Sequence, residues 1–146
     1  MHEKSMVKAI LFDMEGTLTH EHQAMPWTKD LLVALKDHPV KTAVLTDLTE
    51  EKGRALLAEA GVDPSAFDRL ISTTHYDEAF EKTAEAFGIT TDEILFCTAS
   101  AVGIKLASRK GMTSVAARAR FSEEFYKKAG ATYVLNTLAN LPDLLK

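Results

Sequence analysis

The sequence predicts a three-layer α/β protein, in which helices cover both faces of a mostly parallel, doubly wound sheet. Short apolar runs, partly β-branched or aromatic, alternate with longer segments of helical spacing along all 146 residues. Apolar residues at successive positions are typical of strands that are buried on both faces of a parallel sheet. Repeated alternation of strand and helix indicates right-handed βαβ units, which build a doubly wound sheet.

The candidate elements follow one another regularly from the first apolar run to the last. The predicted strands are residues 7–12, 42–45, 69–71, 94–97, 113–116 and 133–135. The predicted helices are residues 27–36, 50–60, 78–87, 102–110, 123–129 and 138–145. Plausible N-caps are Thr49, Ser122 and Asn136, and glycines that can close a helix are Gly61, Gly88, Gly111 and Gly130. Residues 19–25 and 61–68 lack a pattern, so we expect loops there.

Composition indicates one globular domain over residues 1–146, with residues 1–6 as an N-terminal extension. Hydrophobic residues make up 46% and charged residues 26% of the chain, which excludes a disordered protein. No apolar run approaches the roughly 20 residues of a membrane helix, and the first residues do not resemble a secretory signal. Cys97 is the only cysteine and the net charge is −4, so we expect a cytoplasmic protein that binds neither nucleic acid nor membranes.

Two acidic residues follow the first predicted strand, in the segment Asp13-Met14-Glu15-Gly16-Thr17. In an open α/β sheet, ligands bind beyond the carboxyl ends of the strands, near the point where the strand order reverses. A carboxylate at this position can attack phosphorus, and a second acid nearby can protonate the leaving group and activate water. Backbone amides around Gly16 could cradle an anion. The alternative is that both acids are only turn and capping residues.

This segment, with the apolar residues before it, resembles the first motif of the haloacid dehalogenase (HAD) superfamily of aspartate-nucleophile phosphatases and related hydrolases. The order of elements is also similar to that superfamily over nearly all of the chain from Val7 onward. Thr46, after the second strand, resembles the residue of the second motif, and residues 93–96 with the helix after them resemble the frame of the fourth. The resemblance implies a HAD-like Rossmann-type fold, here without a cap domain.

The resemblance also implies roles for individual residues. It makes Asp13 the nucleophile, Glu15 the general acid/base, and Thr46 a hydrogen-bond partner of the transferred phosphoryl group. The implied phosphate-binding residues are Gly16, Thr17, Thr46 and Asp47. If the protein is active, the implied cofactor is Mg²⁺, held by Asp13, by the backbone carbonyl of Glu15 and, in one alternative, by Asp47.

Glu15 stands where the first motif usually has a second aspartate, and three further positions depart from the family pattern. Thr74 stands where the third motif has its lysine, and Ala99 and Gly103 stand where the fourth motif has its acids. Loss of the lysine removes one positive charge, and loss of the acids removes ligands of the metal ion that would supply more. Positive charge is what lets a phosphate dianion approach Asp13. At about 4 Å and an effective dielectric constant of about 20, one charge pair contributes up to roughly 4 kcal/mol. Because each ~1.4 kcal/mol corresponds to about tenfold in rate, efficient phosphatase activity is not expected.

Some neighbouring residues could replace what is missing, although each has an ordinary structural explanation. Asp47 could bind a metal, or it could be a polar turn residue. His75 could supply positive charge when protonated, or it could be a surface histidine. Lys105 could point at the site, or it could be a solvated helix lysine.

Three hypotheses therefore remain open. The first is a catalytically weak or inactive phosphatase-type domain, a pseudoenzyme with a binding or regulatory role. The second is an active hydrolase, either a phosphatase with a relocated metal site or a metal-free enzyme similar to a dehalogenase. The third is an unrelated α/β protein such as a receiver-like domain. The expected partners are a protein, a small phosphorylated molecule or a second copy of the chain, because an uncapped site is open to a large partner.

Overall fold

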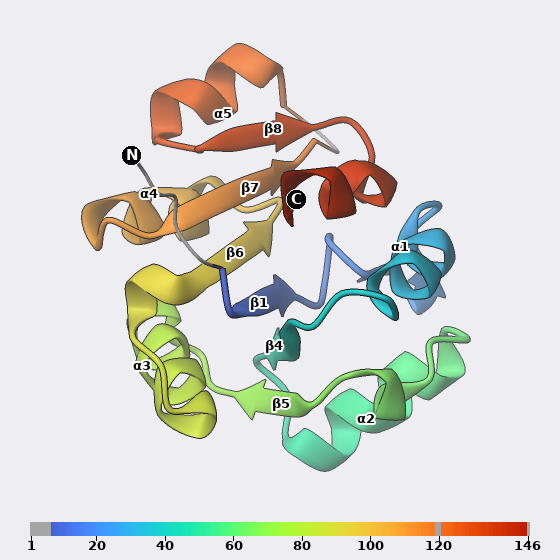
Figure 1. Cartoon of the computed structure of the whole chain (residues 1–146). Coiled ribbons are helices and arrows are strands. Elements are labelled where there is room, and N and C mark those ends of the chain that lie inside the picture. Colours follow the sequence, from blue (N-terminus) through green and yellow to red (C-terminus); the bar gives the residue numbers. More distant parts are fainter. Residues whose placement is uncertain (1–6, 119–120, 146) are drawn as a thin grey trace.

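A central sheet of six parallel strands runs through the molecule in the order β5-β4-β1-β6-β7-β8 (Figure 1). The computed structural model describes residues 7–118 and 121–145. The strands are β1 (Ala9–Asp13), β4 (Lys41–Thr46), β5 (Arg69–Ser72), β6 (Ile94–Thr98), β7 (Thr113–Ala117) and β8 (Tyr133–Leu135). The predicted α/β class with a parallel sheet is therefore confirmed.

Helices form a layer on each face of this sheet (Figure 1). The helices are α1 (Thr28–Leu35), α2 (Glu50–Glu59), α3 (Tyr76–Phe87), α4 (Ala101–Arg109), α5 (Glu123–Ala129) and the 3₁₀ helix η3 (Leu138–Leu145). Helices α1, α2 and η3 lie on one face, and α3, α4 and α5 lie on the other. The helix α3 begins at Tyr76, two residues before the predicted start, and this difference matters for the site.

Alternate residues of β1 face the two helical layers. Ile10 and Phe12 belong to the core beneath α1 and α2, whereas Leu11 belongs to the core beneath α3 and α4. All three side chains are completely buried. Burial on both faces explains why this strand is an uninterrupted apolar run, and it makes β1 the rigid centre from which Asp13 emerges.

Two of the three predicted N-caps are confirmed, and the third is wrong. The Thr49 and Ser122 hydroxyls accept hydrogen bonds from backbone amides of α2 and α5, respectively. Before η3 the cap is Thr137, whose hydroxyl accepts from the amide of Ala139 at 3.2 Å, while the side chain of Asn136 accepts from Arg118. Pro142 lies inside η3 and has no N–H to donate, which is consistent with a 3₁₀ helix here.

The two predicted loops contain short regular elements. Residues 19–25 hold the antiparallel hairpin of β2 (Thr19–His20) and β3 (Gln23–Ala24), whose turn residues Glu21 and His22 have φ of 52° and 67°. Residues 61–68 include the 3₁₀ turn η1 (Pro64–Ala66), and a similar turn, η2 (Thr91–Glu93), precedes β6.

Residues 14–27, which include this hairpin, separate β1 from α1, and residues 73–75 separate β5 from α3. The predicted extension at residues 1–6 lies outside the described residues. Within residues 7–118 and 121–145, no helix is both long and apolar enough to span a bilayer.

Candidate functional site

Asp13 lies at the carboxyl end of β1, the strand at the centre of the site. Its neighbours in the sheet are β4, which ends at Thr46, and β6, which ends at Thr98. From β1 the chain adds β4 and β5 on one side and β6 to β8 on the other, so the strand order reverses at Asp13. This is the point at which doubly wound sheets bind ligands.

Two hydroxyl groups donate hydrogen bonds to the same oxygen of Asp13. The Thr98 hydroxyl lies 2.7 Å from Oδ2, and the Tyr76 phenol lies 2.9 Å from it. Thr98 comes from the neighbouring strand, whereas Tyr76 reaches in from the first turn of α3. Hydrogen bonds to a carboxylate are stronger than those between neutral groups, so this pair holds the Asp13 side chain in one orientation.

The ring of Tyr76 occupies space that a side chain at position 103 would otherwise fill. A Cβ atom built on Gly103 would lie 3.1 Å from Cε1 of Tyr76 and 3.1 Å from Cε2 of Phe96. Tyr76 also packs against Phe96, with ring centroids 5.7 Å apart, and against Phe80, with centroids 6.4 Å apart. The absence of a side chain at Gly103, an acidic position in the family pattern, therefore makes room for the tyrosine.

Sequence reasoning did not assign Tyr76 to the site. The signal that could have found it is a combination of two features, an aromatic residue close to the position of the missing lysine and a glycine in the place of an acid. Because Tyr76 is the first residue of α3, its side chain lies at the end of the helix that faces the sheet edge. The predicted helix start at residue 78 placed it in a loop.

Burial dominates the electrostatics of Asp13. Desolvation raises the pKa of its carboxyl group above the ordinary value, and the charge of Asp47 raises it further. The hydrogen bonds from Thr98 and Tyr76 lower the pKa, but they do not offset burial. Burial and the adjacent Asp13 charge raise the pKa of Tyr76 to about 12, so the phenol stays protonated and remains a donor at neutral pH.

Asp13 also borders a small hollow of about 110 Å³. Asp47, Thr74 and His75 line the same hollow, so the position of the missing lysine does lie beside the predicted nucleophile. Thr46 is 4% exposed, and its hydroxyl accepts a hydrogen bond from the amide of Leu48 at 3.1 Å. The structure thus brings Asp47 and Thr74 to Asp13, while it places the Thr46 hydroxyl in the turn that leads to α2.

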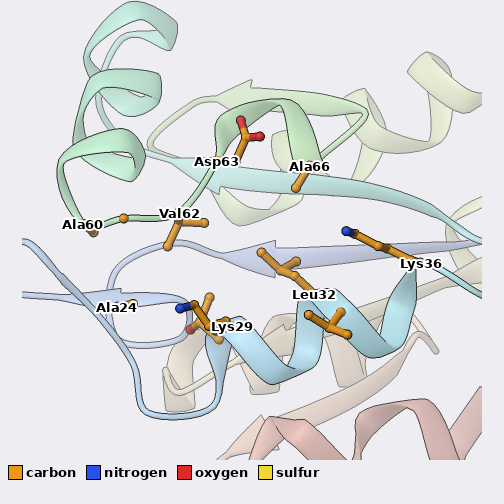
Figure 2. A pocket seen from close by; sticks show the side chains of 11 residues that line it. Ala24, Lys29, Leu32, Lys36, Ala60, Val62, Asp63 and Ala66 are labelled. Carbon is orange, nitrogen blue, oxygen red and sulfur yellow. The ribbon is translucent and has the colours of Figure 1, made fainter.

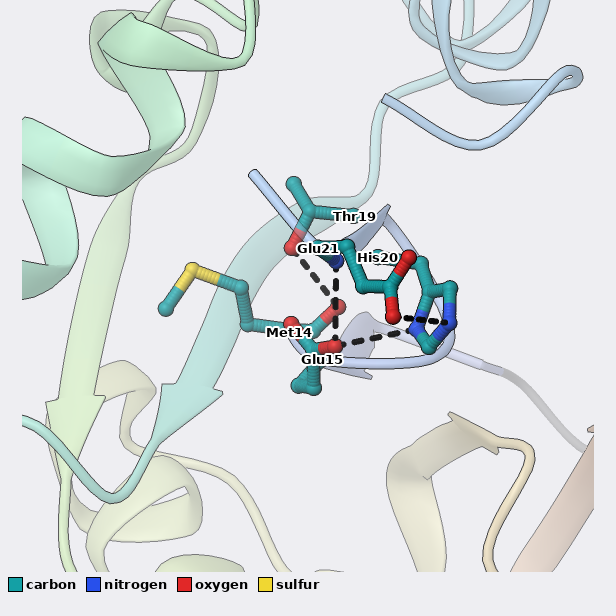
Figure 3. A network of polar contacts seen from close by, with 5 residues as sticks. All are labelled: Met14, Glu15, Thr19, His20 and Glu21. Atoms are coloured by element: carbon teal, nitrogen blue, oxygen red, sulfur yellow. Dashed lines mark hydrogen bonds and ion pairs between the residues drawn. The ribbon is translucent and has the colours of Figure 1, made fainter. Parts of the chain in front are cut away.

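The carboxylate of Glu15 is engaged by the hairpin that follows it (Figure 3). Its Oε2 lies 3.1 Å from Nδ1 of His20 and accepts a hydrogen bond from the amide of Glu21 at 3.4 Å. A general acid must reach the leaving group directly or through one water molecule. Here the carboxylate interacts with the hairpin instead, and the general acid/base role of Glu15 stays a prediction.

Gly16 and Thr17 use their polar groups within the turn after β1. Gly16 has φ of 84°, a conformation that favours glycine, and its N–H donates to the carbonyl of Thr19 at 2.6 Å. The Thr17 side chain is completely buried, and its hydroxyl is a buried polar atom without a hydrogen-bond partner in the structure. The phosphate-binding roles predicted for both residues therefore remain predictions.

Ser100 lies in the short connection between β6 and α4. Its hydroxyl accepts a hydrogen bond from the amide of Gly103 at 3.2 Å, which makes it the N-cap of the helix. The carbonyl of Ala99 accepts a hydrogen bond from the Tyr126 hydroxyl at 2.9 Å. Lys105, two residues beyond Gly103, is exposed, as expected for a solvated helix lysine.

The side chains at this edge do not offer Mg²⁺ a suitable set of ligands. Mg²⁺ requires near-octahedral oxygen ligation and is commonly held by one or two carboxylates with several waters. In the described part of the chain, no three His, Cys, Asp or Glu residues gather as a metal would require. One oxygen of Asp13 is already occupied by two hydroxyl donors. A magnesium site at Asp13 and Asp47 consequently has no support in the donor set.

Solved structures show the same fold at low sequence identity. An L-2-haloacid dehalogenase from Xanthobacter autotrophicus, with chloropropionic acid covalently bound, superimposes with a TM-score of 0.79 at 17% identity, over 96% of this chain and 98% of that one. A HAD family hydrolase from Deinococcus radiodurans R1, with bound phosphate and sodium, gives a TM-score of 0.78 at 16% identity, over 94% of each chain.

Sequence comparison alone shows less. No family model matches the chain. The chloroplastic protein SUPPRESSOR OF QUENCHING 1 of Arabidopsis thaliana is 24% identical over an alignment of 122 residues, and this alignment covers 80% of this chain but only 12% of that protein. The chain thus spans about an eighth of the length of this relative. Together with the parallel sheet and the position of Asp13, the structural likeness shows that the chain has the fold of the haloacid dehalogenase superfamily.

Proposed function

We propose that this protein is a HAD-fold domain with little or no hydrolytic activity, which acts as a binding or regulatory module. The observation that carries this proposal is the contact of Tyr76 with Asp13. The phenol donates to the carboxylate that would have to attack a substrate, and its ring fills the space beside Gly103. The fold is intact, but the protein's own tyrosine is hydrogen-bonded to the carboxylate at its reactive edge.

The charge around Asp13 also opposes catalysis on a phosphate ester. Two carboxylates, Asp13 and Asp47, border the hollow, and among the described residues His75 is the only basic one that lines it. A phosphate dianion would meet net negative charge wherever His75 is neutral. A transition state with further charge on the phosphoryl oxygens would meet still stronger repulsion, and no arginine or lysine among the lining residues offsets it.

The test compares the protein with Asp13→Asn, because asparagine keeps an acceptor oxygen for both hydroxyls. We expect the two proteins to hydrolyse para-nitrophenyl phosphate at the same background rate, with and without added magnesium. The circular dichroism spectrum and unfolding midpoint establish that the variant is folded. Turnover by the parent protein that Asp13→Asn abolishes would contradict the proposal.

A second candidate is a metal-free hydrolase similar to a dehalogenase. The observation in its favour is that both hydroxyls donate to the same oxygen of Asp13, Oδ2. Oδ1 could attack the carbon of a halogenated acid and release halide, and water would then cleave the resulting ester to a hydroxy acid. A raised pKa of Asp13 opposes this reaction, because the protonated carboxyl is a poor nucleophile.

Chloride release from 2-chloropropionate separates the two candidates. The module hypothesis expects no release above that of the Asp13→Asn variant. The dehalogenase hypothesis expects release that depends on Asp13, together with a mass increase of the protein in a single turnover. That second result would replace the proposal of an inactive domain.

The hollow at Asp13 is too small to enclose a drug-sized ligand, since such pockets usually measure about 300–1,000 Å³. A partner that uses this edge would therefore contact it from outside, as a protein surface or a second copy of the chain does. We propose a contact of this kind in preference to binding of a small phosphorylated molecule. A cytoplasmic location remains a prediction. Sedimentation velocity across a concentration series tests for the second copy.

A further inference from the structure

A cavity larger than the hollow at Asp13 lies away from that residue, along α1. It measures about 460 Å³ and is bounded by α1, by the hairpin residue Ala24 and by the segment from Ala60 to Ala66 that follows α2 (Figure 2). This volume falls within the range of small-molecule sites. None of its lining residues belongs to the motifs that resemble the HAD superfamily.

The cavity has an apolar middle and a lysine at each end. Figure 2 shows Leu32 pointing toward Val62 across the cavity, with Lys29 at one end and Lys36 at the other. The two lysines are seven positions apart, which corresponds to about 10 Å along an α-helix. Among the described residues, neither ammonium group has a carboxylate within 4.0 Å.

The one acidic residue in the lining does not compensate these lysines. The Oδ1 atom of Asp63 accepts hydrogen bonds from the amide and the hydroxyl of Ser65, at 3.0 and 2.8 Å. Figure 2 shows its carboxylate turned away from the cavity, on the side opposite α1. A chain with a net charge of −4 thus presents two unpaired positive groups around an apolar hollow.

We propose that this cavity binds an elongated organic dianion, with a carboxylate at each end and an apolar spacer between them. The spacer would remove apolar surface of Leu32 and Val33, which both line the cavity, from water. The two carboxylates would pair with Lys29 and Lys36. This site is independent of the proposed function at Asp13, because it shares no residue with the hollow there.

Three probes of the same length test the charge pattern. Suberate has two carboxylates, octanoate has one, and octane-1,8-diol has none. Titrations followed by ¹H–¹⁵N correlation spectra should give the affinity order suberate, octanoate, diol, with about threefold between successive probes, as expected for exposed ion pairs. The shifted signals should come from Ala24, Leu32, Val62 and their neighbours. Equal affinity for suberate and the diol would overturn the proposal.

Variants locate the two ends and the middle of the site. Lys29→Gln and Lys36→Gln should each reduce the affinity for suberate to about that for octanoate, whereas Lys127→Gln, on α5, should leave it unchanged. Ala66→Phe should fill the cavity and weaken binding of all three probes by tenfold or more. Because these positions are exposed, we expect all four variants to fold. Unchanged suberate affinity in both Lys29→Gln and Lys36→Gln would reject the site.

Discussion

The hollow at Asp13 and the cavity along α1 differ in size, and the larger of the two lies where no sequence motif is found. The hollow lies where the family resemblance places chemistry, yet it measures only about 110 Å³, and Tyr76 fills the space beside it. The cavity measures about 460 Å³, and no motif marks it. The comparison teaches that short motifs indicate where a backbone turns and where a carboxylate lies, whereas the packing of other side chains decides how much space remains.

The difference arises from the side chains that line each region. Around Asp13, large aromatic rings from α3 and β6 meet a glycine of α4, and the contact is tight. Along α1, small residues such as Ala24, Ala60 and Ala66 leave space that Leu32 and Val62 do not fill. Added volume should therefore be costly in the first region and tolerated in the second.

The largest effect should come from Gly103→Asp, which returns an acid of the fourth motif. Its Cβ would lie 3.1 Å from the Tyr76 and Phe96 rings, at a position that is buried. Overpacking alone costs about 1–3 kcal/mol, so we expect a loss of about 3 kcal/mol in the free energy of unfolding, measured by urea denaturation.

Two controls sharpen this result. Val102→Asp adds the same charge one residue earlier on α4, where the side chain is 60% exposed, and it should change stability by less than about 0.5 kcal/mol. Ala66→Phe adds more volume, but beside the open cavity, and should be equally mild. If Gly103→Asp were no more destabilising than Val102→Asp, the rings would not be tightly packed against Gly103.

The next effect in size is that of Tyr76→Phe, which removes the phenol and keeps the ring. The variant loses one hydrogen bond to a partly buried carboxylate, and we expect a loss of about 1–2 kcal/mol. The pKa of Asp13 should rise, because the Tyr76 hydrogen bond lowers it. Unfolding measures the first change, and a ¹³C NMR titration of the carboxyl carbon measures the second.

Tyr133→Phe is the matched control for the loss of a phenol, because Tyr133 is 38% exposed and lies on the edge strand β8. Its stability should stay within about 0.5 kcal/mol of the parent protein. If the pKa of Asp13 were the same in the parent protein and in Tyr76→Phe, the contact between phenol and carboxylate would not exist in solution.

The sequence was sufficient to predict the fold and the edge of the sheet at which the site lies. Buried strands such as β1 are long apolar runs, and the end of each run shows which residues meet: Asp13, Thr46 and Thr98 do lie on adjacent strand ends. The role of Tyr76 could not be predicted in the same way. Its direction depends on the space left by Gly103, a residue 27 positions away in the printed sequence.

Glu15 and the cavity show the same limit. The spacing of Asp13 and Glu15 suggests two acids that act together, but the hairpin of β2 and β3 binds the second carboxylate through His20 and Glu21. The hairpin itself has only two residues in each strand, too few for an alternating pattern. A cavity has no sequence pattern at all, because it consists of the volume that side chains from separate segments leave empty.

A smaller effect is expected from Asp13→Asn, and it should depend on pH. The pKa of Asp13 is raised in the folded protein, so the native state holds its proton more tightly than the unfolded state does. The parent protein therefore loses stability as the pH rises from the ordinary carboxyl pKa, 3.8, through the raised one. Asparagine cannot ionise and avoids this loss, so it should be the more stable form at pH 7.

Urea unfolding of both proteins at pH 7 and at pH 3 measures this dependence. The advantage of Asp13→Asn should be present at pH 7 and should disappear at pH 3, where Asp13 is protonated in both states. Asp37→Asn, at an exposed position after α1, controls for the loss of a carboxylate as such. An Asp13→Asn variant that is less stable than the parent at pH 7 would mean that the ionised carboxylate contributes favourably to folding.

The smallest expected effect is that of magnesium on the parent protein. Asp13 and Asp47 border the hollow, but Oδ2 of Asp13 already accepts two hydrogen bonds, and in the described part of the chain no three acidic, histidine or cysteine side chains are grouped so that they could hold a metal ion. Millimolar Mg²⁺ should therefore leave the thermal unfolding midpoint unchanged.

Ala99→Asp provides the contrast, because it adds a carboxylate at the end of β6 beside Asp13. A ligand that binds only the folded state at about 100 times its dissociation constant stabilises it by roughly 2.7 kcal/mol, so this variant should be less stable in chelator and should gain stability with Mg²⁺. A clear magnesium shift in the parent protein would show that the edge at Asp13 holds a cation despite its two hydroxyl contacts, and the hydrolase hypothesis would then replace that of a closed binding module.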